Sequence, residues 1–148
     1  MPNLASIQRV SILATEGVFA STLTQAKDFF HMASLRYGKQ LGLDLTPAFE
    51  TRLVSPDGKA VNTFSGIAIA VDSPLDDADM VILPAFWGDF DALCAQHPGV
   101  MPWLRERHAA GSVICGEATG VFWMAQAGLL EGREATTHWR FANDFVER

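Results

Sequence analysis

Short apolar runs alternate with longer amphipathic stretches along most of this chain. Residues 9–14 form a short, largely apolar run, and residues 79–83 (DMVIL) form another, each of the length that a buried parallel strand requires. Residues 45–54 alternate between apolar and polar positions, and residues 63–71 are extended, with three apolar side chains on one side. Each of these four patterns predicts a strand.

Helical spacing separates the predicted strands. Thr22 or Thr24 is placed to cap a helix that ends near Gly38 or Gly42. The apolar positions of this helix are Ala26, Phe29, Phe30, Ala33 and Tyr37. Shorter helices are expected over residues 90–96 and 101–110. Strands that alternate with helices indicate an α/β fold, in which a parallel sheet carries helices on both faces.

A strand, a tight turn and a helix follow one another between residues 112 and 129. Four β-prone residues at 112–115 lead into the turn 116–120, and the helix behind it keeps an apolar face (Val121, Met124, Ala125 and Leu129). This order is typical of the nucleophile elbow, which exposes its central residue above a sheet beside free N–H groups. An enzyme places Ser or Cys at that centre. Here the centre is Ala118, which has no nucleophilic atom.

The residues around the turn resemble a known family. Ala118-Thr119-Gly120, AGLL at 127–130, GR at 132–133 and ATTHW at 135–139 are similar to the N-terminal domain of GlxA-type AraC-family transcription regulators. That domain belongs to the PfpI branch of the class I glutamine amidotransferase-like superfamily, and its elbow reads Cys-Thr-Gly. The resemblance is dense over residues 118–139 and extends more loosely to near residue 8. It implies a flavodoxin-like three-layer sandwich with a central, mostly parallel sheet.

Three loops should meet at the carboxyl ends of the strands, where open α/β sheets bind ligands: residues 15–22, 84–89 and 116–120. In enzymes that the chain resembles, the first loop supplies an acidic residue five positions after a glycine. Counting from Gly17 reaches Thr22, which carries no charge. Glu16 is acidic but precedes the glycine, so it either points into the site or is a solvated loop carboxylate.

The second loop and the histidine also bear on catalysis. The family pattern reads Pro-Gly-Gly where this chain has Pro84, Ala85 and Phe86, and these side chains disfavour a preformed oxyanion hole. His138 matches the family position of a histidine beside the nucleophile. Because Ala118 gives it no thiol to serve, it either lines a pocket by hydrogen bonding or makes a purely structural contact.

The two cysteines allow one alternative nucleophile. Cys115 would need exposure, a base and an oxyanion donor to react, whereas the end of an apolar strand predicts a buried, inert thiol. Cys94 reads as a small core residue of a helix. Two cysteines do not make a disulfide framework, so reduced thiols in the cytoplasm are the plain interpretation.

Glu117 and several aromatic residues complete the expected site. Glu117 could cap the helix behind the elbow or occupy its anion site. Because Phe122 and Trp123 are adjacent on that helix, one should lie in the core and the other at a pocket or interface. A mostly apolar pocket suits a small-molecule effector. The predicted ligand-binding residues are Glu16, Thr22, Phe86, Trp87, Glu117, Ala118, Thr119 and His138, with no catalytic residue.

Composition narrows the function classes. Hydrophobic residues make up 49% of the chain and charged residues 19%, as in a compact folded domain. A net charge of -6, with 11 scattered Lys and Arg, argues that this segment does not hold nucleic acid by itself. No apolar run approaches the ~20 residues that cross a bilayer. The other three histidines have no second ligand at metal spacing, so we expect neither metal nor cofactor.

The resemblance also suggests how the chain relates to its family. Such domains continue past Thr-Thr-His-Trp with a further strand and helix and then a helix-turn-helix pair, whereas residues 140–148 read as one helix without a basic face. We therefore expect residues 1–148 to form a single sensor domain, truncated at its C-terminal end. DNA would be bound only by a helix-turn-helix domain absent from this chain. The uncovered sheet edge, or the helices beside it, should make the domain associate as a homodimer.

Three hypotheses for the function follow. The first is a non-catalytic domain that senses an unknown effector and dimerises within a transcription regulator. The second is an amidase, a hydrolase or a glyoxalase-like enzyme that uses Cys115 or Glu16 with His138. The third is a dimerisation module without a ligand. The combined loss of the thiol, the loop carboxylate and the glycine pair favours the first.

Overall fold

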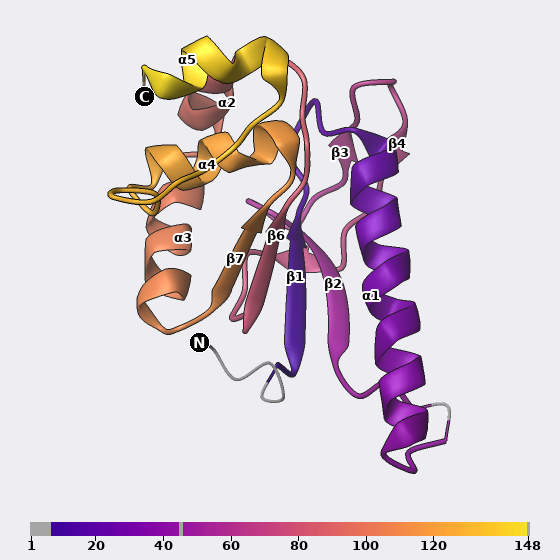
Figure 1. Cartoon of the computed structure of the whole chain (residues 1–148). Coiled ribbons are helices and arrows are strands. Elements are labelled where there is room, and N and C mark those ends of the chain that lie inside the picture. The colour runs from indigo at the N-terminus through magenta and orange to yellow at the C-terminus, as the bar shows by residue number, and fades with distance from the viewer. Residues whose placement is uncertain (1–6, 45, 148) are drawn as a thin grey trace.

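A sheet of five parallel strands forms the centre of the protein, in the order β5-β2-β1-β6-β7 (Figure 1). It is seen in a computed structural model, which describes residues 7–44 and 46–147. The strands are β1 (Arg9–Leu13), β2 (Glu50–Ser55), β5 (Ser73–Pro74), β6 (Met80–Leu83) and β7 (Val113–Gly116). In the register of the sheet, Ile12 of β1 lies between Leu53 and Ile82.

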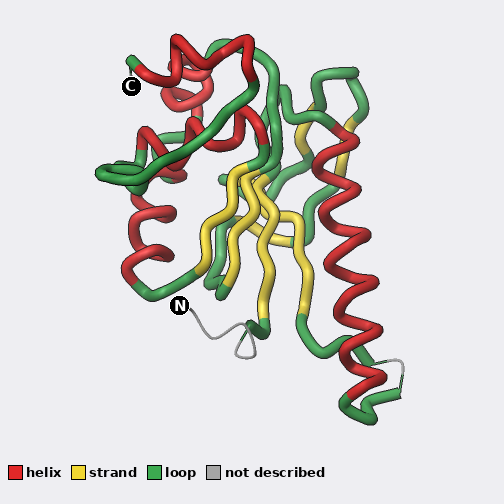
Figure 2. The backbone as a smooth tube through the Cα atoms, in the orientation of Figure 1, coloured by secondary structure: helices red, strands yellow, loops and turns green. Residues whose placement is uncertain are grey.

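Helices cover both faces of the sheet (Figure 2). One face carries α1 (Ala20–Gln40), and the other carries α2 (Phe90–Gln96), α3 (Val100–Ala109) and α4 (Val121–Gln126). Two 3₁₀ turns, η2 (Ala118–Gly120) and η3 (Trp139–Phe141), and the short α5 (Ala142–Val146) complete the chain. The predicted flavodoxin-like three-layer sandwich is confirmed.

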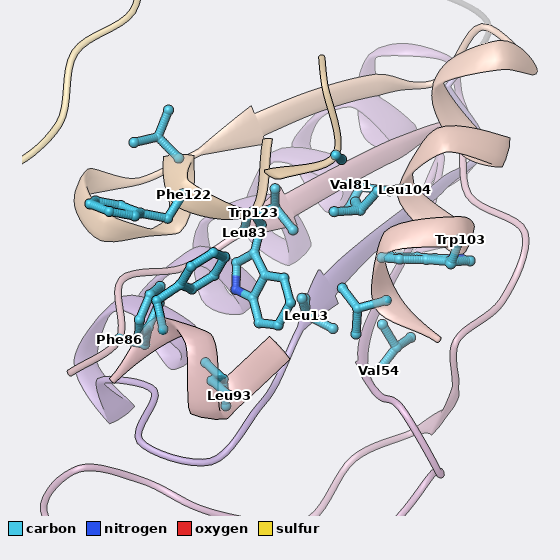
Figure 3. Packing of buried hydrophobic residues seen from close by; sticks show 14 of the residues in the cluster. Leu13, Val54, Val81, Leu83, Phe86, Leu93, Trp103, Leu104, Phe122 and Trp123 are labelled. Carbon is cyan, nitrogen blue, oxygen red and sulfur yellow. The ribbon is translucent and has the colours of Figure 1, made fainter. Parts of the chain in front are cut away.

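The sheet separates two apolar cores, because successive strand residues point to opposite faces. Val10 and Ile12 of β1 belong to the core under α1, together with Leu23. Leu13 belongs to the larger core between the sheet and α2, α3 and α4 (Figure 3). Phe86 and Trp123 belong to this larger core and pack on each other, so the 84–89 loop and the elbow helix rest on buried side chains.

The first helix differs from its prediction in its start and in its buried face. It begins at Ala20, and neither Thr22 nor Thr24 caps it as predicted. The hydroxyl of Thr22 donates to the carbonyl of Phe19, and the hydroxyl of Thr24 donates to the carbonyl of Ala20. Both hydroxyls bond backward along the helix instead of satisfying its first N–H groups. The helix ends at Gln40, and Gly42 follows with a φ of 75°. The later of the two predicted ends is therefore the better one.

The buried face of α1 includes small and polar residues as well as apolar ones. Its buried residues are Leu23, Ala26, Ser34 and Gly38, whereas Phe29 and Tyr37, two of the apolar positions predicted for this helix, are exposed. Ser34 exchanges hydrogen bonds of 2.6 and 2.8 Å with the backbone of Phe49. A Cβ on Gly38 would lie 2.2 Å from the carbonyl oxygen of Thr46, so the following loop packs directly on the helix there.

Two predicted strands are shorter than expected. The strand expected over residues 45–54 begins only at Glu50 (Leu45 lies outside the described residues). The extended stretch expected over residues 63–71 is not one strand. Instead, β3 (Val61–Asn62) and β4 (Ala68–Ile69) form an antiparallel hairpin. The turn of the hairpin contains Gly66 with a φ of 81°, a conformation that breaks an extended run.

The elbow strand β7 lies at one edge of the sheet. It pairs with β6 alone, and beside it runs a groove of about 590 Å³, whose apolar lining includes Ile114, Met124, Leu129 and Leu130. The helix after η2 ends at Gln126, and Gly128 follows with a φ of 75°. The N–H of Gly128 donates to the carbonyl of Ala125 and that of Leu129 to the carbonyl of Met124, as in a Schellman motif. Gly128 is therefore the left-handed residue that ends the helix.

Candidate elbow site

The turn after β7 keeps the backbone shape of a nucleophile elbow. Ala118 has a φ of 47°, in the left-handed region that an alanine rarely occupies, and it is exposed to solvent. The flanking glycines make this turn possible. A Cβ on Gly120 would lie 1.9 Å from the carbonyl oxygen of Leu83, and one on Gly116 would lie 2.9 Å from the Cα of Val121. The chain therefore retains a strained turn at a position without a nucleophile.

Thr119 ties the elbow to the 84–89 loop. Its hydroxyl donates to the carbonyl of Phe86 at 2.8 Å and accepts from the N–H of Phe86 at 2.9 Å. Both residues are buried, so water does not compete for these hydrogen bonds. The elbow and this loop are held together through one side chain and one peptide segment.

The first loop joins the same cluster, so the three loops meet as predicted. The N–H of Phe19 donates to the carbonyl of Ala85 at 2.9 Å, and the N–H of Trp87 donates to the carbonyl of Gly17 at 2.9 Å. Gly17 has a φ of 76°, and a Cβ there would lie 2.6 Å from the oxygen of Trp87. Because the N–H groups of Phe86 and Trp87 both have partners within the protein, neither is directed at a reacting oxygen.

The two polar candidates of the first loop face different neighbours. The carboxylate of Glu16 is exposed and accepts from the N–H of Asn62 in β3, so it holds the hairpin to the loop. The hydroxyl of Thr22 donates to the carbonyl of Phe19 at 3.0 Å and lies 3.5 Å from that of Ala85. Each of these side chains connects backbone segments around the elbow.

Glu117 and Cys115 are both disfavoured as ions. Burial raises the pKa of the Glu117 carboxyl above its ordinary value. Burial also raises the pKa of the Cys115 thiol, and the nearby charge of Glu117 raises it further. Glu117 precedes η2, but its side chain accepts no hydrogen bond from the turn. Of the two alternatives for Glu117, the helix cap is therefore wrong, whereas the inert thiol predicted for Cys115 agrees with its surroundings.

The segment after the elbow helix returns over the site through a residue that the sequence did not single out. The hydroxyl of Thr137 donates to the carbonyl of Ala118 at 3.1 Å. His138, the residue expected there, is exposed, and its Nδ1 accepts from the N–H of Arg140 at the start of η3. The ring of His138 packs near Trp139 and Phe141. The Thr-Thr-His-Trp motif indicated that this segment lies at the elbow, but it did not indicate which of its side chains makes the contact.

Aromatic rings form a continuous row beside the elbow. Trp87 lies 5.8 Å from the ring of Phe64 and 5.7 Å from that of Phe141, and the guanidinium of Arg140 lies over the Trp87 ring. Phe64 in turn packs on Phe19 at 5.2 Å. The sequence did not reveal the role of Phe64, which depends on the hairpin turn. Ser-Gly at 65–66 was the available signal for that turn.

Phe122 and Trp123 are both buried, and of the two Phe122 also lines a cavity beside the elbow, which agrees with the predicted division between core and pocket. Their exposed fractions are 2% and 1%, and both rings contact Phe90 of α2 (Figure 3). Helix α4 is covered by the sheet on one side and by α2 and α5 on the other, because Phe122 also packs on Phe145. Two adjacent helix residues can both be buried when the helix lies between two layers.

A small cavity of about 130 Å³ lies at the elbow. It is lined by Phe86, Gly88, Asp89, Phe90, Thr119, Phe122, Phe141 and Asp144. Four of these eight residues are aromatic, and two of the eight, Phe86 and Thr119, were predicted to bind a ligand. The volume is close to that of an engineered apolar cavity, about 150 Å³, that binds benzene.

The described residues add no metal centre or membrane span. Within residues 7–44 and 46–147, no three His, Cys, Asp or Glu side chains come together in a way that could hold a metal ion. No helix in this part of the chain has the length and apolar character needed to cross a membrane.

The chain matches one protein family and is similar to several named transcription regulators. Residues 9–148 match the DJ-1/PfpI family. The HTH-type transcriptional regulator CdhR of Pseudomonas aeruginosa is 33% identical over 116 residues, which are 76% of this chain and 33% of CdhR. The HTH-type transcriptional regulator GlxA of Rhizobium meliloti is 26% identical over 145 residues, 93% of this chain and 40% of GlxA.

A solved structure agrees with these matches. A protein of Vibrio parahaemolyticus assigned as a transcriptional regulator superposes with a TM-score of 0.72 at 26% identity, covering 96% of this chain and 72% of that one. The chain spans a third to two fifths of the length of the two regulators. The predicted resemblance to GlxA-type regulators is confirmed. The chain belongs to the DJ-1/PfpI family.

Proposed function

We propose that this chain is a non-catalytic effector-sensing and dimerising domain of an AraC-type transcription regulator that acts in the cytoplasm. One observation carries the proposal. The elbow keeps its strained backbone at Ala118, with a φ of 47°, although no nucleophilic atom is there. A strained turn costs stability, and we infer that it is retained because it shapes a binding site.

The contacts of the alternative nucleophiles support this proposal. Cys115 has a raised pKa, Glu16 bonds to the backbone of Asn62, and His138 bonds to the backbone of Arg140. An enzyme would need one of the first two beside the histidine. Glu16 and His138 instead bond to the backbone of two different segments.

The cavity at the elbow is our proposed effector site. Its aromatic lining favours a small, largely apolar molecule, or the apolar part of a larger one. The polar groups beside it, Asp89, Asp144 and the hydroxyl of Thr119, would set the orientation of the ligand. CdhR and GlxA are both named as helix-turn-helix (HTH) transcriptional regulators. We propose that DNA is bound by such a helix-turn-helix domain of a longer protein.

Ligand-induced stabilisation tests the sensing function. A library of small metabolites is screened by thermal unfolding, since a ligand present at 100 times its Kd adds about 2.7 kcal/mol to the stability of the domain. For any hit, Phe141→Ala should weaken binding because Phe141 lines the cavity. Trp139→Ala is the matched control, since Trp139 is 80% exposed and does not line it.

Two results would contradict the proposal. One is a hit whose affinity falls equally in both variants, which would place the ligand elsewhere. The other is hydrolase, amidase or glyoxalase turnover by the wild-type protein that Cys115→Ala abolishes, which would identify an enzyme.

A further inference from the structure

The segment from residue 137 to residue 147, here called the strap, forms one wall of the elbow cavity. Figure 1 shows its helix α5 over the end of the domain that α2 and α4 form. Phe141 and Asp144 of the strap line the cavity. The other lining residues come from the 86–90 segment and the elbow, and four of them are buried in the domain: Phe86, Phe90, Thr119 and Phe122. One wall of the cavity therefore belongs to the core, whereas the other lies on the surface.

The strap contacts the domain through one residue in four. Thr137, Phe141 and Phe145 are half-buried, and the other residues of the strap are exposed. The hydroxyl of Thr137 donates to the carbonyl of Ala118 at 3.1 Å. The rings of Phe141 and Phe145 lie 6.5 and 5.3 Å from the ring of Phe122. Because no residue of the strap is fully buried, little apolar surface fixes it to the domain.

The backbone of the strap bonds to itself, and the connection that precedes it is open. The N–H of Phe141 donates to the carbonyl of His138, and that of Glu147 donates to the carbonyl of Asn143. Residues 131–136 are all exposed and belong to no helix or strand. Gly132 among them has a φ of 69°, and no heavy atom of the described chain lies within 4 Å of a Cβ added there. Segments with few buried contacts and exposed connections open locally at a lower free energy than the core.

We propose that the strap is a lid over the elbow cavity, which opens about residues 131–136 and which the effector closes. The inference rests on the proposed function and deepens it, because it names how the same site is regulated. A molecule in the cavity contacts the core wall and the strap together. It therefore binds the closed form more tightly than the open form and shifts the population toward closure. Thr137 is the latch of the lid, since its hydrogen bond joins the strap to the centre of the elbow.

Native-state hydrogen exchange of the whole chain, followed by mass spectrometry, tests the latch. Thr137→Val removes the hydroxyl but keeps the shape of the side chain. It should speed the exchange of residues 138–147 by about threefold to tenfold, as the loss of one hydrogen bond predicts. Thr136→Val is the matched control, an exposed neighbouring threonine changed in the same way. The exchange of β1 should stay the same in both variants, which would show that the fold is intact.

Benzene is the probe for closure, because the cavity of about 130 Å³ is close in volume to one that benzene fills. Benzene near saturation should slow the exchange of residues 138–147 in the wild-type protein by about threefold or more. Residues 61–69 of the β3–β4 hairpin are the internal reference. They should exchange at an unchanged rate, since the hairpin supplies none of the residues that line the cavity.

The outcomes separate the lid from the site that it covers. Equal exchange of residues 138–147 in Thr137→Val and Thr136→Val would overturn the latch and with it the lid. Benzene that protects residues 86–90 and 119–122 but not residues 138–147 would overturn the lid, while the proposed effector site would stand. Benzene that protects none of these residues would overturn the cavity as the effector site, and the lid would fall with it.

Discussion

Replacing Ala118 by glycine should stabilise the protein, although it removes a side chain. The φ of 47° places Ala118 in the left-handed region, where an L-residue is strained by about 1–2 kcal/mol. Glycine adopts this conformation freely, but its greater freedom in the unfolded chain costs about 0.4–1 kcal/mol. Because Ala118 is exposed, little packing is lost. The net gain should be about 0.5–1 kcal/mol.

Urea and thermal unfolding at one fixed protein concentration measure this gain, which corresponds to a rise in Tm of about 2 °C for a chain of this length. Ala110→Gly is the matched control. Ala110 is also exposed, but it has a φ of -74°, so the same change should destabilise by about 0.5–1 kcal/mol. If both variants lose stability to the same extent, the elbow is not strained and the main support for the proposed site is lost.

Three further changes test the elbow and its helix. Gly128→Val should lower the free energy of unfolding by more than about 1 kcal/mol, because a φ of 75° strains any branched residue. No heavy atom lies within 4 Å of the added Cβ, so the loss would come from the backbone alone. An unchanged Tm would contradict this prediction. Ala118→Cys should introduce a thiol that iodoacetamide alkylates faster than Cys94 or Cys115, since helix N–H groups stabilise a thiolate; equal rates in mass spectrometry would exclude such an effect. Glu117→Gln should stabilise the protein at neutral pH. Burial raises the pKa of Glu117 above its ordinary 4.5, so its favourable contribution is complete below that pH and is lost as the pH rises through the raised pKa. The advantage of the variant should disappear in unfolding curves below about pH 4, and an advantage that is independent of pH would refute the assignment.

The strands that could be predicted from the sequence are those buried on both faces. β1 is largely apolar and β6 entirely so, because both faces of these strands lie in a core. The β3–β4 hairpin could not be predicted from the sequence, because strands of two residues are too short to show an alternation of apolar and polar positions. The buried face of α1 was misread because Ser34 and Gly38 are buried through a hydrogen bond and a close backbone approach, which hydropathy does not record.

The site was predictable where a local motif determines it. Ala118, Thr119 and the left-handed Gly128 follow from the elbow pattern and its neighbouring residues. The contact of Thr137 with the carbonyl of Ala118 spans 19 residues and depends on how the returning segment crosses the elbow. Phe64 reaches Trp87 through a hairpin of another part of the chain. Such contacts arise from tertiary packing and have no local signature.

The hydrogen bonds of Thr119 have a practical consequence for redesigning specificity. They use the backbone N–H and carbonyl of residue 86 and nothing of its side chain. The two hydrogen bonds themselves therefore tolerate any residue other than proline at position 86, whereas the packing on Phe90 and Trp123 favours apolar side chains there. Residue 119, in contrast, must supply a hydroxyl. A mutant library that varies residues 85–87 and holds 119 and 120 constant would sample many cavity shapes on one unchanged scaffold.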